Sequence, residues 1–153
     1  MQDHNARRNT SLGYRVSRLY RLNSCLLDRW LSEHDLCSGQ IPYIMATVEK
    51  AGQTQEQLSA YIRVCPAATT RMLKNMESAG LVRRKENPDN RRQNLVHPTA
   101  KAKALYSALI PILDQHNEVM LKGFSEEEKV QIRAMLDRIA TNVQKQLNGE
   151  KDK

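Results

Sequence analysis

The sequence predicts a mainly α-helical fold that contains one small β-hairpin. Apolar residues recur every three or four positions along most of the 153-residue chain, which is the spacing of one helix face. Two motifs in which Ser or Thr is followed three residues later by Glu or Gln mark helix starts. A cluster of turn-forming residues, Asn87-Pro88-Asp89-Asn90, lies between two strand-like segments. A chain of this length is expected to form one domain, residues 1–153, with a core that needs no disulfide.

The N-terminal part is predicted to form a long helix over residues 12–33, followed by a shorter one. The long helix has an apolar stripe stepped by three or four positions: Leu12, Val16, Leu19, Leu22, Leu26 and Trp30. Arg15 and Arg18 lie on its other face. Ser38 is expected to cap the shorter helix, which Pro42 can begin and Gly52 ends.

Two short helices with separate start signals follow. The motif Thr54–Gln57 opens the first, with Leu58, Tyr61 and Ile62 expected to face inward. The second is predicted over Pro66–Ala79, and its inward face consists of Thr69, Met72, Leu73 and Met76. Only about three or four residues join these helices, which predicts a helix-turn-helix.

The hairpin follows over residues 81–97 and carries arginines at its tip, after which helix resumes at Thr99. The second capping motif, Ser125–Glu128, starts a last helix that runs to about Leu147. The long segments 12–33 and 99–147 have apolar stripes that the small helix-turn-helix cannot cover. We therefore expect a homodimer that buries them, with a monomeric helical bundle as the alternative.

Positive charge is concentrated in the middle third of the chain. Residues 54–103 hold ten Lys or Arg and four Asp or Glu, a net of +6 out of the whole chain's +7. This pattern is typical of a protein that binds a polyanion, although a solvated basic face is the alternative. Only Tyr61 is aromatic there, whereas single-strand binders stack bases on several aromatic residues. Double-stranded DNA is therefore the expected partner.

The sequence lacks the motifs that are typical of other classes of protein. There is no Gly-rich phosphate loop, GxSxG or HExxH motif, so neither an enzyme nor a bound cofactor is expected. The His34 and Cys37 region offers no complete metal-ligand set. The longest apolar stretch, Ser107–Leu113, is too short to span a membrane. Residues 1–10 lack an apolar signal core, and three cysteines without CxxC favour the reducing cytoplasm.

The order of these elements resembles the MarR family of bacterial transcription regulators. The resemblance is carried by Gln57-Leu58-Ser59, Val64–Arg71, Glu77–Val82 and Asn87–Arg92. It covers about residues 12–147. It implies a winged helix-turn-helix at 38–98, flanked by long N- and C-terminal dimerisation helices at 12–33 and 99–147.

Three positions depart from the family's pattern. Asn90 stands where the wing usually has Asp, Arg63 replaces a small residue or Gly in the turn, and Cys65 occupies the usual Ser/Thr cap. The first departure removes the carboxylate that the family's intra-wing ion pair uses at this position. The resemblance implies a regulator that, by family default, represses transcription.

The outward face of the second short helix is expected to enter the major groove. Its predicted contacts are Pro66, Ala67, Ala68, Thr70, Arg71 and Lys74. Arg71 can donate two hydrogen bonds to guanine, and the methyl group of Thr70 can meet a thymine methyl. In the alternative interpretation, Ala67 and Ala68 only favour helix formation and do not contact DNA.

The hairpin is expected to supply further DNA contacts. Arg83, Arg84 and Lys85 would bind phosphates, and Arg91 or Arg92 would enter the minor groove. In the alternative interpretation, one arginine pairs with Asp89 and holds the wing together.

The family resemblance also implies a signal that releases DNA. A crevice for a small aromatic or anionic effector would involve Arg15, Arg18, Tyr43 and Met45. Alternatively, Tyr43 and Met45 are core residues. A second hypothesis is redox sensing by Cys65, because a helix N-terminus favours the thiolate. The alternative is that all three cysteine thiols are inert.

A third hypothesis for the function is a winged-helix module that binds protein and not DNA.

Overall fold

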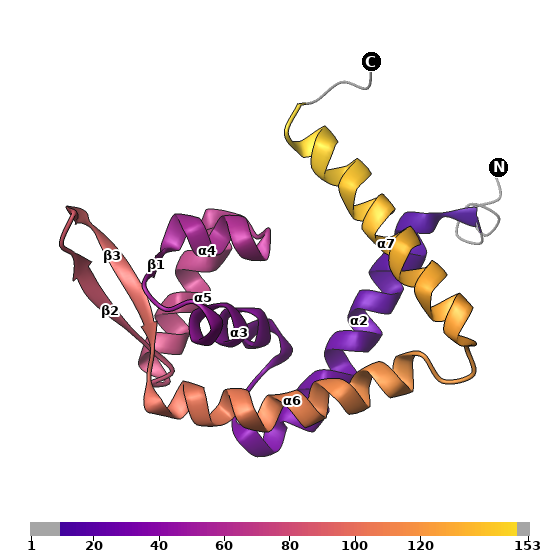
Figure 1. Cartoon of the computed structure of the whole chain (residues 1–153), viewed down its shortest axis with the longest axis horizontal. Coiled ribbons are helices and arrows are strands. Elements are labelled where there is room, and N and C mark those ends of the chain that lie inside the picture. Colours follow the sequence, from indigo (N-terminus) through magenta and orange to yellow (C-terminus); the bar gives the residue numbers. More distant parts are fainter. Residues whose placement is uncertain (1–9, 150–153) are drawn as a thin grey trace, which may run out of the picture. The chain divides into compact units, whose positions relative to one another are not determined.

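The structure, a computed structural model, describes residues 10–149 (Figure 1). Its helices are α2 (Leu12–Leu31), α3 (Ile41–Glu49), α4 (Gln55–Ile62), α5 (Pro66–Ser78), α6 (Ala100–Met120) and α7 (Glu126–Leu147). Its strands are β1 (Gln53–Thr54), β2 (Val82–Asn87) and β3 (Asn90–Pro98). Two short 3-10 turns, Ser32–His34 and Ser38–Gln40, connect α2 to α3. The mainly α fold with a small β-hairpin wing is confirmed.

Contacts between residues divide the chain into two compact units, Met1–Ile112 and Leu113–Lys153, with the boundary inside α6. The first unit contains the helix-turn-helix, the sheet and α2. The second contains the end of α6 and the whole of α7. The prediction of one continuous domain stays a prediction.

The core of the first unit lies between α3, α4, α5 and the sheet. Its fully buried side chains include Ile44, Leu58, Leu73, Met76, Leu81 and Val96, and Leu31 of α2 and Leu109 of α6 are also fully buried in this unit. Thr69 is also fully buried and Met72 is half-buried, so the predicted inward face of α5 is confirmed. The expectation for Tyr61 is wrong, because its side chain is 64% exposed. Helix α4 has only two turns, and Leu58 already fills its central buried position.

The two capping motifs are confirmed as capping boxes. At α4, Gln57 N donates to Thr54 Oγ1 over 3.2 Å and Thr54 N donates to Gln57 Oε1 over 2.9 Å. The Ser125 motif does the same at the start of α7. The expectation that Ser38 caps a helix is wrong, because Ser38 begins a 3-10 turn and its amide donates to Asp28 Oδ1 over 2.6 Å.

The sheet has a third strand that the sequence analysis did not predict. Strand β1 pairs antiparallel with β3 through Gln53↔Val96 and Thr54↔Leu95, giving the strand order β1-β3-β2. The side chain of Gln53 also donates to the carbonyl oxygens of Ala46 (3.0 Å) and Lys50 (2.8 Å) at the end of α3. This strand therefore ties α3 and the start of α4 to the base of the wing.

The turn between α4 and α5 adopts a conformation that favours glycine. Arg63 has φ 59° and ψ 46°, the left-handed region, which costs a residue with a Cβ about 1–2 kcal/mol. Arg63→Gly is therefore expected to raise the free energy of unfolding by about 1 kcal/mol, measured by urea denaturation. Arg63→Ala is the control, because it removes the charge and keeps the strain. Equal stability of the two variants would contradict this explanation.

Candidate nucleic-acid interface

Helix α5 presents the predicted polar face to solvent. Pro66 is in its first turn, where a missing amide proton has no cost, and Cys65 precedes it. Ala67, Thr70, Arg71 and Lys74 are exposed and Ala68 is half-buried, while Thr69, Leu73 and Met76 on the other side are buried. Within residues 10–149, the side chains of Arg71 and Lys74 make no ion pair or hydrogen bond. Both cations are therefore available to an external partner.

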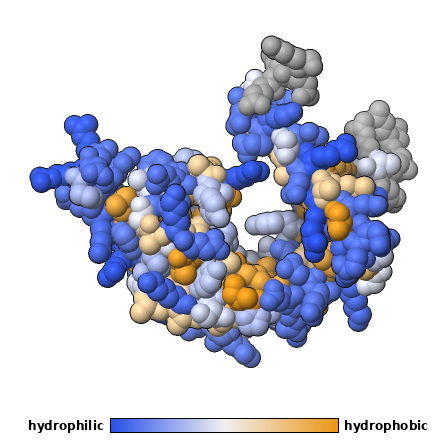
Figure 2. Space-filling view, in the orientation of Figure 1, coloured by the Kyte–Doolittle hydropathy of each residue, from blue (hydrophilic) through white to orange (hydrophobic). Residues whose placement is uncertain are grey.

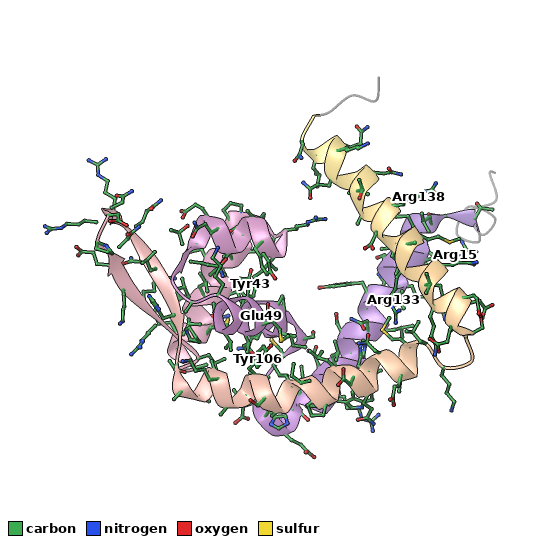
Figure 3. The ribbon with its side chains drawn as sticks, viewed as in Figure 1. Arg15, Tyr43, Glu49, Tyr106, Arg133 and Arg138 are labelled. Atoms are coloured by element: carbon green, nitrogen blue, oxygen red, sulfur yellow. The ribbon has the colours of Figure 1, made fainter. Side chains whose placement is uncertain are left out.

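A buried hydrogen bond fixes α5 to α3. Tyr43 Oη and Thr69 Oγ1 are 3.1 Å apart, and both side chains are buried. Tyr43 belongs to α3, which lies beside the helix-turn-helix (Figure 3). The orientation of α5, and with it the direction of Arg71, depends on this packing.

Removing this hydroxyl is expected to destabilise the protein. Tyr43→Phe leaves Thr69 Oγ1 buried without its partner, a cost of about 1–3 kcal/mol in the free energy of unfolding. The double variant Tyr43→Phe/Thr69→Val replaces both partners by apolar groups and should recover part of the loss. Chemical denaturation measures both. If the two substitutions destabilise additively, the hydrogen bond contributes nothing to stability.

The wing places its two tip arginines in an irregular segment. The pairing between β2 and β3 changes from Glu86↔Asn94 to Asn87↔Asn90, so residues 91–93 have no partner in β2. Such bulges redirect side chains. Arg91 and Arg92 are exposed, on a wing whose surface is strongly hydrophilic (Figure 2).

The wing contains an ion pair, but not the one considered from the sequence. Arg91 Nε lies 3.4 Å from Glu86 Oε1 across the hairpin, with both side chains largely exposed. Pairing with Asp89 is wrong, since no arginine in residues 10–149 pairs with it. The amide of Asp89 instead donates to Asn87 Oδ1 over 3.0 Å. An exposed pair of this kind contributes little stability, so Arg91 can exchange Glu86 for a phosphate.

Arg83 and Arg84 point to opposite faces of the sheet. Arg84 is opposite the buried Val96, and its Nε lies 3.5 Å from Glu77 Oε2 of α5. A phosphate would have to compete with that carboxylate. Arg83 is exposed and is opposite His97 on the other face. The two arginines predicted to bind phosphates therefore lie on opposite faces, and Arg84 joins the wing to α5.

A polar groove separates the wing from the helix-turn-helix. Its volume is about 160 Å³. It is lined by Gln55, Glu56, Leu73, Arg84, Arg92, Gln93, Asn94 and Val96. The groove brings Arg92 close to the start of α4, so α4, α5 and the wing share one surface.

His97 is a half-buried residue of β3, near the base of the wing and opposite Arg83. Burial, and then the charges of Lys85 and Arg83, lower the pKa of His97 below its usual 6.5. A lowered pKa in the folded state means that stability is complete above about pH 6.5 and decreases as the pH falls below it. The free energy of unfolding should therefore decrease less between pH 7 and pH 5 in His97→Gln. An identical pH dependence in wild type and variant would contradict this assignment.

The predicted effector residues differ in exposure. Tyr43 is 3% exposed, and its hydroxyl is bonded to Thr69, while Met45 is half-buried. Arg15 and Arg18 are exposed on the first turns of α2, and Figure 3 shows Arg15 far from Tyr43. The burial of Tyr43 agrees with the alternative interpretation, and its role beside a ligand stays a prediction. Tyr43 is a core residue because its ring fills the space beside α5.

The candidate redox residue, Cys65, is accessible in the structure. Cys65 is exposed at the N-cap of α5, and its side chain makes no capping hydrogen bond. Within residues 10–149, no three His, Cys, Asp or Glu side chains are grouped to hold a metal ion. No helix in that range has the length and apolarity required to cross a membrane.

A helix-turn-helix followed by a β-hairpin wing defines a winged-helix protein. The sequence model of the MarR family matches residues 48–93, which include α4, α5 and most of the wing. The HTH-type transcriptional regulator YybA of Bacillus subtilis (strain 168) is 32% identical over 111 residues, 72% of this chain and 74% of YybA. The chain therefore belongs to the MarR family of transcriptional regulators.

Solved structures agree with this assignment. The crystal structure of the transcriptional regulator SlyA superimposes with a TM-score of 0.85 and 26% identity, covering 93% of this chain and all of SlyA. A MarR family regulator from Listeria monocytogenes, solved in complex with 26mer DNA, gives a TM-score of 0.80 and 26% identity over 94% of this chain and 99% of its own. The winged-helix fold is thus one that related proteins share.

Proposed function

We propose that this protein is a cytoplasmic transcriptional repressor that binds double-stranded DNA in a sequence-specific manner. The observation that carries the proposal is the outward face of α5, where Arg71 and Lys74 have no partner within residues 10–149. A helix of this kind enters the major groove with its N-terminal residues against the bases. The DNA complex of the Listeria relative supports this interpretation.

The proposed contacts divide by role. Arg71 reads guanine through two hydrogen bonds, and Ala67, Ala68 and the Thr70 methyl contact thymine. Pro66 lets the helix start close to the DNA backbone. Lys74, Arg83 and Arg84 bind phosphates and set the register, Arg84 only when it leaves Glu77. Arg92, with Arg91, enters the neighbouring minor groove.

We further propose that the protein acts as a homodimer. In α2, the stripe that includes Leu12, Val16, Leu19 and Leu22 is exposed along its N-terminal half. In α7, no residue is buried, and Leu136 (48%), Val143 (56%) and Leu147 (77%) are exposed. Apolar faces of this length indicate an interface. A two-fold dimer binds a palindrome with half-sites about 10 bp apart, or a multiple of that.

In-vitro selection of bound duplexes from a random pool tests the proposal. The expected product is a palindrome, and the logarithm of its affinity should decrease linearly with the logarithm of salt concentration. Recovery of unrelated duplexes would contradict sequence-specific binding. Failure to bind any duplex would favour a winged-helix module that binds protein.

Release by a signal is the last part of the proposal. A small aromatic or anionic effector that weakens operator binding must itself bind less tightly in the presence of operator. A ligand screen on the selected duplex tests this reciprocity. The exposed Cys65 supports thiol oxidation as a second mechanism, because a modified Cys65 would lie against DNA. Peroxide sensitivity that persists in Cys65→Ser would exclude this residue as the sensor.

A further inference from the structure

A hydrogen-bonded bridge joins the two helices of the helix-turn-helix on their outward side. Gln55 Nε2, at the start of α4, donates to Thr70 Oγ1 of α5 over 2.7 Å. Thr70 Oγ1 in turn donates to the carbonyl oxygen of Pro66 over 2.9 Å. Sequence periodicity could not reveal this pair, because the two residues are fifteen positions apart in different helices.

The chemistry of this bridge determines what Thr70 can offer to a base. The Pro66 carbonyl can only accept, so the single hydroxyl proton of Thr70 is committed to it. Gln55 must therefore be the donor, which also fixes the orientation of its amide group. With Oγ1 held from two sides, one rotamer of Thr70 is selected. The methyl group is the part of the side chain that these bonds leave free.

The location of Gln55 links this bridge to the wing. Gln55 is half-buried and lines the groove that also contains Arg92 and Arg84. Thr70 is exposed on the same α5 face as Arg71. The bridge thus lies on the surface that α4, α5 and the wing share.

We propose that Gln55 is a positioning residue for base readout. It holds Thr70 in the rotamer that presents a methyl group to the methyl group of thymine, so specificity at one base pair depends on a residue of α4. This inference rests on the proposed DNA-binding function. It assigns to Gln55 a role that differs from phosphate binding, because a lost phosphate contact weakens all sequences alike.

Replacing thymine by uracil tests this role, since the two bases differ only in the methyl group. Each thymine of the selected operator is replaced by uracil in turn, and the affinity of wild type and of Thr70→Ala is measured on each duplex. The base that Thr70 contacts is the thymine whose replacement no longer changes the affinity of Thr70→Ala. At that base, wild type should prefer thymine about fourfold, the value of one buried methyl group. Gln55→Ala should lower this ratio, because Thr70 Oγ1 then keeps only its bond to Pro66 and its second rotamer becomes accessible.

Thr70→Val supplies the matched background, because both branches of its side chain are methyl groups. It should keep the thymine preference, and adding Gln55→Ala should not lower it further. Thermal unfolding confirms that all variants are folded.

Several results would overturn the inference. Gln55→Ala could keep the wild-type ratio of thymine to uracil affinity, or it could lose affinity equally for both duplexes. Gln55→Ala could also lower the ratio as much in the Thr70→Val background. Finally, there could be no thymine whose replacement leaves the affinity of Thr70→Ala unchanged. If wild type binds no duplex, the proposed function fails and this inference fails with it.

Discussion

Leu136→Glu is expected to convert the protein to a monomer and to reduce operator affinity by at least a factor of about 100. Leu136 lies on the apolar stripe of α7 and is 48% exposed, so the proposed dimer would bury the new charge. A buried unpaired carboxylate strongly opposes association. A monomer can occupy only one half-site and loses the gain of about 10²–10⁴ that linked binding provides.

The control for this prediction is Ala134→Glu. Ala134 is exposed on the opposite side of the same helix, two positions and therefore about 200° away from Leu136. The Ala134→Glu substitution adds the same charge to the same helix, outside the apolar stripe. Sedimentation and operator titration measure the outcome. A Leu136→Glu variant that stays dimeric, or a monomer that binds the palindrome as wild type does, would contradict the assigned interface.

Arg71→Ala is expected to weaken operator binding by about 1–3 kcal/mol and to relax the preference at one base pair in each half-site. The guanidinium is exposed on α5 and has no partner within residues 10–149. Its loss should therefore affect DNA binding without changing the free energy of unfolding. Binding titrations on single-substitution operator duplexes measure both the affinity and the preference.

Lys74→Ala is the comparison for Arg71. Lys74 lies about one turn further along α5, and a lysine bound to phosphate carries no sequence information. Its removal should weaken all duplexes about equally and reduce the salt slope by about one. If Arg71→Ala behaves in this same uniform way, Arg71 binds phosphate and the reading face is misassigned.

Local sequence signals predicted the elements and the exposed face of α5 well. The spacing of Thr69, Leu73 and Met76, together with Pro66 and the capping motif at Thr54, identified both the helices and their orientation. These signals succeed because they depend on the period of one helix and on the amides at its end.

Contacts between elements were not predictable in the same way. Arg84 with Glu77, Gln55 with Thr70, and Tyr43 with Thr69 join different elements. Their pairing depends on how these elements pack, which no local pattern contains. Strand β1 was missed because two residues cannot show an alternating pattern.

Arg71 is proposed to meet a guanine in the major groove. Methylation protection at guanine N7 on the selected operator tests this contact directly, since Arg71 is proposed to bond to N7 and O6 of that base. Wild type should protect one guanine in each half-site that Arg71→Ala leaves reactive, while Lys74→Ala still protects it at saturating protein concentration. An unchanged protection pattern in Arg71→Ala would show that Arg71 does not contact this guanine.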